Sequence, residues 1–180
     1  MRHLFFIPEE DNTESRIDYR KLALDGFKAL NPLVRYINNC GLEKSLLDLV
    51  FLRASQINGC AYCIDMHTKD ARAEGETEQR LHALSAWRET PFYSDRERAA
   101  LAWTEAITLV NRDHVPDDVY QETRRHFGEK EIVDLTLAVI AINSWNRLAI
   151  SFRAVPGSYH RERAAGDVRR EGARASHAAR

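Results

Sequence analysis

The sequence predicts an all-α fold. Strand signals are nearly absent, because no run of alternating β-branched residues occurs and no Asn-Gly turn lies between two such runs. Apolar residues instead recur three and four positions apart, and capping residues, prolines and glycines separate these stretches at helical lengths. The chain of 180 residues is 44% hydrophobic and 29% charged, which suits one globular domain with an apolar core. We therefore expect a compact bundle of seven or eight helices over residues 1–157.

Four helices are expected in the first half of the chain. Residues 18–30 place apolar side chains on one helical face. Asn31-Pro32 has the form of an N-cap followed by a first-turn proline, so a second helix is expected to begin there and to end at Gly41. Residues 42–57 are apolar nearly all round, which indicates a central, buried helix. A fourth helix is expected from Cys60 to about Glu74.

Four further helices are expected in the second half. Thr77 is a candidate N-cap for a short helix through Ala86. A capping box of sequence Ser-Asp-Arg-Glu opens a helix over residues 94–110. Pro116 suits the first turn of the next helix, which Phe127-Gly128 ends. The last long helix is expected over residues 129–150, where most apolar side chains are predicted to be buried.

Composition disfavours several classes of partner. A net charge of −1 provides no overall field that would attract nucleic acid or an anionic membrane surface. No apolar run approaches the roughly 18 residues of a membrane span, and no signal peptide is visible, so a cytoplasmic location is expected. Residues 158–180 form an Arg/Ala-rich tail. Its arginines alternate with alanine and acidic residues, which favours a flexible tail over a basic arm for a partner.

The strongest chemical signal is a pair of cysteines followed by a histidine. Cys60 and Cys63 lie three residues apart, and His67 follows Cys63 by four. A zinc site would need four ligands, or three and a water, and no further cysteine pair or histidine stands at a recognised spacing. With only three cysteines in the chain, a secreted disulfide framework is also disfavoured. Two inert, buried thiols beside a core histidine remain an alternative interpretation.

Helical geometry favours a redox interpretation of the pair. Asn58-Gly59 ends the preceding helix, so Cys60 is expected in the first turn of the next one, where the backbone can adjust to let Cys60 and Cys63 form a disulfide. Unpaired N–H groups and the helix dipole at that end lower the pKa of a thiol. Cys63 and His67 share a helix face, so the imidazole can accept the thiol proton. A thiolate, a base and a second thiol form a complete peroxide-reducing set.

At these residues the sequence resembles the alkylhydroperoxidase D-like family of the carboxymuconolactone decarboxylase superfamily. The resemblance rests on the stretch from Leu52 to His67, and also on residues 103–106 and 145–147, and it extends over most of residues 15–155. It implies an all-helical, thiol-dependent peroxidase that assembles as dimers, trimers or hexamers. It implies a hydroperoxide substrate, no bound cofactor, and an external dithiol reductant of the lipoyl or thioredoxin-like type. The decarboxylase branch works without the cysteine pair, which disfavours lactone decarboxylation here.

The resemblance also implies roles for individual residues. Cys63 would attack the peroxide, Cys60 would be the exposed resolving thiol, and His67 would be the base. Asp48 stands where the family typically has the glutamate of a proton relay, and Tyr62 stands where the best-known members have a histidine. Tyr62 can donate a hydrogen bond but is no base near neutral pH.

Asp48 is also conspicuous without the family, because it lies on the helix that is otherwise nearly all apolar. A buried acid is costly unless it is paired, so an ion pair with Arg53 or Arg147 is the alternative to a relay. Ser55 and Asn58 are expected to cap or pin the turn, although Ser55 could also hydrogen-bond a thiolate. The alternative function is a redox-sensing or metal-binding helical module with little turnover.

Overall fold

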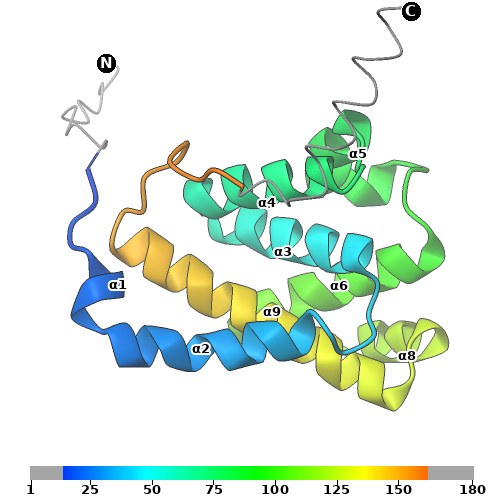
Figure 1. Cartoon of the computed structure of the whole chain (residues 1–180). Helices are drawn as coiled ribbons and strands as arrows, with labels where there is room; N and C mark the ends of the chain where they lie inside the picture. Colours follow the sequence, from blue (N-terminus) through cyan, green and yellow to red (C-terminus); the bar gives the residue numbers. More distant parts are fainter. Residues whose placement is uncertain (1–13, 162–180) are drawn as a thin grey trace, which may run out of the picture.

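The computed structural model describes residues 14–161, which contain nine α-helices, one 3-10 helix and no strand (Figure 1). The all-α class is therefore confirmed. The helices are α1 Tyr19–Leu22, α2 Leu24–Ile37, α3 Lys44–Asn58, α4 Ala61–Ala73, α5 Glu78–Ala83, the 3-10 helix Leu84–Glu89, α6 Asp95–Thr108, α7 Val110–Asp113, α8 Asp117–His126 and α9 Glu129–Ser151. Within residues 14–161, no helix combines the length and the apolar character needed to cross a bilayer.

Helix α3 forms the centre of the fold and packs against α4, α6 and α9 (Figure 1). Its side chains at Leu47, Leu49, Val50 and Leu52 are at most 1% exposed, because successive turns face different neighbouring helices. This confirms the buried helix predicted over residues 42–57. Burial of this kind contributes about 1.5–3 kcal/mol per large apolar side chain, so α3 is a rigid base for the residues at its end.

The N-terminal helices differ from the prediction. The stretch expected as one helix over residues 18–30 is interrupted at Ala23, where the backbone leaves helical geometry. Asn31-Pro32 does not begin a new helix, because Pro32 lies inside the continuous helix α2. Pro32 has no backbone N–H to donate within the helix, so packing against α9 supports α2. Phe27, in the first turns of α2, makes an edge-to-face contact with Trp145 of α9.

Other boundaries agree more closely. The predicted capping box is present, since Ser94 and Glu97 exchange hydrogen bonds at the start of α6. That helix ends at Thr108, and a separate single turn, α7, follows. The expected helix over residues 77–86 is divided into α5 and the 3-10 helix. Single-turn elements of this kind raise the number of helices above the seven or eight expected.

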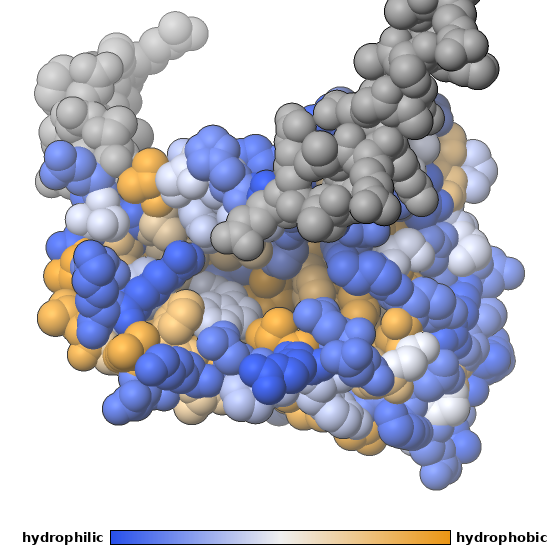
Figure 2. Space-filling model, viewed as in Figure 1, coloured by the Kyte–Doolittle hydropathy of each residue, from blue (hydrophilic) through white to orange (hydrophobic). Residues whose placement is uncertain are grey.

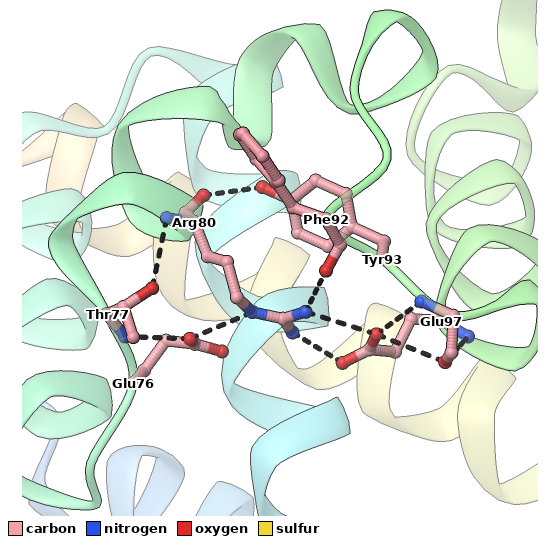
Figure 3. Close-up of polar contacts among 7 residues, drawn as sticks. Glu76, Thr77, Arg80, Phe92, Tyr93 and Glu97 are labelled. Carbon is pink, nitrogen blue, oxygen red and sulfur yellow. Dashed lines mark hydrogen bonds and ion pairs between the residues drawn. The ribbon is translucent and has the colours of Figure 1, made fainter.

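An arginine-centred network joins α5 to the start of α6 (Figure 3). The Arg80 guanidinium donates to Glu76 at 2.9 Å and to Glu97 at 2.5 Å, and it also donates to the carbonyl of Phe92. It lies 4.9 Å from the centre of the Tyr93 ring. The side chains of Arg80, Glu76 and Glu97 are only 22%, 12% and 18% exposed. The ion pairs among them therefore offset the cost of removing these charges from water.

We expect Arg80→Met to lower the free energy of unfolding by about 2–3 kcal/mol at pH 7, because two largely buried carboxylates lose their partner. Urea denaturation measures this loss. Arg125→Met is the matched control, because the Arg125–Glu122 pair is exposed and should contribute less than about 1 kcal/mol. Equal effects of the two substitutions would contradict the assignment.

Candidate active site

The end of α3 positions both cysteines. Gly59 has a left-handed conformation with φ of 68°, which ends α3 and turns the chain into α4. Cys60 is the N-cap of α4, and its Sγ accepts a hydrogen bond from the Cys63 backbone N–H at 3.4 Å. The structure joins Cys60 and Cys63 in a disulfide, with 5.3 Å between their Cα atoms. Cys60 thus occupies the expected place at the start of a helix.

Both cysteines are buried, each only 2% exposed. They form a small cluster with Ala149 of α9, and Tyr62 and Ala154 pack against it. The expectation of an exposed Cys60 is therefore wrong in this disulfide-bonded form. The physical reason is packing from three sides: Ala149 of α9, Tyr62 of α4 and Ala154 in the chain that follows α9 all lie against the pair.

This returning segment, residues 152–161, is called the C-terminal strap below, and Figure 1 shows it leading from the end of α9 toward α4. Three hydrogen bonds, together with an ion pair between Arg161 and the α4 C-cap Glu74, hold it on α4. The backbone N–H of Gly157 donates to Asp65 at 3.1 Å, Lys69 donates to the carbonyl of Tyr159 at 3.2 Å, and the Tyr159 hydroxyl donates to Asp70 at 2.8 Å. Burial and then the Asp70 carboxylate raise the pKa of Tyr159 to about 12.

The strap includes the first residues of the predicted tail, 158–161. These residues are in contact with α4, while residues 162–180 lie outside the described part of the chain.

His67 lies one turn beyond Cys63 on α4, as the spacing predicts. Its ring packs against Phe51 of α3, with 5.3 Å between the ring centres, and its Nε2 atom is buried without a hydrogen-bond partner. Burial, and to a smaller extent the positive charge of Lys44, lower the pKa of His67 to about 4. The ring is therefore neutral at pH 7 and has a nitrogen free to accept a proton.

Cys63 and His67 line the same cavity, of about 300 Å³, which lies among α1, α2, α3, α4 and α9. Most of its lining is apolar, including Phe27, Phe51 and Trp145. Figure 2 shows apolar residues gathered in a hollow in the middle of the face drawn there. Trp145 is half-buried and contributes to the cavity wall as well as to helix packing, a role that its sequence position alone did not indicate.

Asp48 is buried, at 3% exposure, and its carboxylate accepts a hydrogen bond from Lys44. Burial raises the pKa of Asp48, and Lys44 opposes this rise. No direct hydrogen bond joins Asp48 to His67 within residues 14–161, and the second carboxylate oxygen, Oδ2, is buried without a partner. Lys44 is not among the residues predicted for the site, although its place four residues before Asp48 on the same helix is a recognised ion-pair spacing.

The two arginines considered as partners of Asp48 bind elsewhere. Arg53 pairs with Glu105 of α6 at 2.7 Å, and Arg147 donates to the side chain of Asn143 at 2.8 Å. Neither ion pair proposed for Asp48 is present.

Ser55 and Asn58 pin α3 to α9, in agreement with the expectation that they fix this turn. Asn58 Nδ2 donates to the side-chain oxygens of Asn146 at 2.8 Å and Asn143 at 3.0 Å. Asn146 Nδ2 in turn donates to Ser55 Oγ at 3.0 Å. The Ser55 hydroxyl donates to the carbonyl of Phe51, so its proton is not directed at a thiolate. Tyr62 lines the cavity, and its hydroxyl accepts a hydrogen bond from Arg20 at 3.4 Å.

The described residues contain no group of three or more His, Cys, Asp or Glu side chains placed to hold a metal ion. Chemically, the arrangement offers a disulfide that can open to two thiols, and a neutral imidazole. Cys63 and His67 both line the apolar cavity.

Comparisons with known proteins agree with this picture. The carboxymuconolactone decarboxylase family model matches residues 23–106. The chain is 46% identical over 136 residues to YdfG, an uncharacterized protein of Bacillus subtilis strain 168, covering 76% of this chain and 92% of the relative. A crystal structure of a protein of unknown function from Agrobacterium tumefaciens, described as a candidate antioxidant-defence protein AhpD, superposes with a TM-score of 0.78 at 44% identity, covering 81% of this chain and all of that one. The alkyl hydroperoxide reductase AhpD of Mycobacteroides abscessus is 45% identical over 65 residues, 34% of this chain and 37% of the relative.

The low pKa of His67 predicts a pH dependence of stability. A histidine that binds its proton less readily in the folded state stabilises the fold above its unfolded pKa of 6.5, and this contribution is lost as the pH falls toward 4. We expect the wild type to lose about 3 kcal/mol more free energy of unfolding than His67→Leu between pH 7 and pH 4. Urea denaturation of the disulfide-bonded proteins measures the difference. His82→Leu is the control, because His82 is exposed. Parallel pH profiles for the wild type and His67→Leu would refute the assignment.

Proposed function

The chain belongs to the AhpD-like branch of the carboxymuconolactone decarboxylase family, and from this premise we propose that it is a thiol-dependent hydroperoxide reductase. One observation carries the proposal: Cys63, paired with Cys60, lies in the same apolar cavity as a neutral imidazole one turn away. The nucleophile thus has the resolving thiol three residues before it, at the start of α4, and the base four residues after it on the same helix.

In the first step, the reduced Cys63 thiol transfers its proton to His67, and the thiolate attacks one oxygen of the hydroperoxide. The O–O bond breaks, Cys63 becomes a sulfenic acid, and the departing alkoxide takes the proton from His67 to leave as an alcohol. The peroxide gains two electrons and the sulfur loses two. A histidine that holds its proton weakly suits this return of the proton to the leaving group.

In the second step, the Cys60 sulfur attacks the Cys63 sulfenic acid and forms the disulfide. The hydroxyl group leaves and combines with the Cys60 proton as water. An external dithiol, of the lipoyl or thioredoxin-like type, then returns two electrons and two protons to the pair. The dithiol donor protein and the assembly into a homo-oligomer stay predictions from the family resemblance, as does the absence of a bound cofactor.

Asp48 is proposed to complete a proton relay to His67. Asp48 Oδ2 and His67 Nε2 are the two buried side-chain polar atoms without a partner among the described residues, and they belong to helices that pack against each other. Lys44 is close enough to affect the pKa of both groups. A water molecule between these two atoms would give each of them a hydrogen bond. It would also link Asp48 to His67, which are not in direct hydrogen-bond contact.

The alternative of a redox sensor with little turnover has one observation in its favour, which is the burial of both sulfur atoms beneath the strap. A sensor would be oxidised once and reduced slowly, whereas a reductase turns over many times with a small dithiol. Steady-state turnover therefore separates the two.

We expect Cys63→Ser to abolish turnover of cumene hydroperoxide with dithiothreitol, because the attacking sulfur is lost. We expect Cys60→Ser to retain the first step and to accumulate a sulfenic acid at Cys63, detected by dimedone labelling and mass spectrometry. Cys40→Ser is the matched control, since Cys40 is a free cysteine away from the pair. Full turnover by Cys63→Ser would rule out the proposed function.

We expect Asp48→Asn to slow oxidation of Cys63 by about tenfold and to raise the pKa of the Cys63 thiol, because the relay loses its charge. Stopped-flow oxidation across a pH series measures both quantities. Asp134→Asn is the matched control, because Asp134 is equally buried and pairs with Lys130 four residues before it, on α9. If Asp48→Asn leaves both quantities unchanged, or if Asp134→Asn has the same effect, Asp48 has no place in the relay.

A further inference from the structure

The cavity beside Cys63 has one positively charged side chain among its lining residues, Arg20 of α1. Since His67 is neutral at pH 7, Arg20 is the group that gives this otherwise apolar space a charge. The Arg20 side chain is exposed, so it lies where the cavity meets solvent. Cys63, which lines the same cavity, is buried.

Arg20 is held in place without an acidic partner. Its guanidinium lies 5.9 Å from the centre of the Tyr19 ring and 5.7 Å from that of Phe27, and it donates to the Tyr62 hydroxyl at 3.4 Å. No ion pair between the described residues involves Arg20, although its neighbour Lys21 pairs with Asp18. The planar donor group therefore keeps N–H groups available for an anion from solution.

The volume of the cavity indicates an organic ligand. A water molecule occupies about 30 Å³ of liquid, so about 300 Å³ holds on the order of ten non-hydrogen atoms. Hydrogen peroxide would fill only a small part of this space and would leave the apolar walls at Phe51, Met66 and Trp145 without contacts. An apolar group of the size of a benzene ring with its substituents would cover them.

We propose that this cavity binds organic hydroperoxides that carry a carboxylate, with the apolar body against Phe27, Phe51 and Trp145, the carboxylate on Arg20, and the peroxide group at Cys63. The inference rests on the proposed function and names its substrate class. Reduction by the two thiols then yields a hydroxy acid and water, and leaves the Cys60–Cys63 disulfide. Arg20 is a specificity-determining residue in this scheme and takes no part in bond breaking.

The kinetic test uses two substrates that differ by one carboxylate group, cumene hydroperoxide and its 4-carboxy derivative. We expect the wild type to prefer the carboxylated substrate in kcat/KM. Arg20→Gln should lower the ratio of the two kcat/KM values about tenfold, and Arg20→Lys should restore part of it, since a lysine keeps the charge without the planar fork. Lys21→Gln is the matched control on the same helix, because Lys21 does not line the cavity. An unchanged ratio in Arg20→Gln, or an equal fall in Lys21→Gln, would overturn the proposal.

A binding test separates this inference from the proposed function. Isothermal titration calorimetry of the disulfide-bonded protein compares 4-isopropylbenzoate with the neutral 4-isopropylbenzyl alcohol, neither of which can be reduced by a thiol. Tighter binding of the carboxylate, weakened about tenfold by Arg20→Gln, supports the anion subsite even if no peroxide turnover is found. Equal binding of the two compounds, or no binding of either, overturns it even if peroxide turnover is present.

Discussion

The left-handed turn at Gly59 fixes the position of both sulfur atoms, and the rest of the site depends on it. It ends α3 where that helix is pinned to α9 by Asn58 and begins α4 with Cys60 as its N-cap. A residue with a Cβ is strained at this φ of 68°, so glycine suits the position. Because Cys63 and His67 follow on the same helix, this one turn determines where the proposed nucleophile and base lie relative to α3.

Burial controls the protonation state of the site. The packing of His67 against Phe51 keeps the imidazole neutral, and the same low-polarity surroundings raise the pKa of Asp48. Lys44 lowers the pKa of both groups, because a nearby positive charge favours the deprotonated form of each. His67 is thus unprotonated at neutral pH, whereas an exposed imidazole would have a pKa near 6.5 and would be partly protonated.

The disulfide is covered on one side and faces a cavity on the other. The strap, anchored to α4 through Asp65, Lys69 and Asp70, packs against the cysteine cluster, while Cys63 also faces the apolar cavity. Under the proposed function, a small hydroperoxide would reach Cys63 through the cavity. The proposed dithiol donor would reach the pair either by a thin extension into the same cavity or after displacement of the strap.

The sequence by itself determined the helical class, the buried α3, the capping of α6 and the order of Cys60, Cys63 and His67 on α4, because each follows from local spacing along one helix. Only the tertiary structure decided that α2 continues through Pro32, that Asp48 pairs with Lys44 while Arg53 pairs with Glu105, and that Cys60 is buried against α9 and the start of the strap. Arg20 and Trp145 likewise reach the cavity from opposite ends of the chain. These outcomes depend on contacts between residues far apart in sequence. Packing there outweighs local helix propensity, and the spacing of residues along one helix does not predict such contacts.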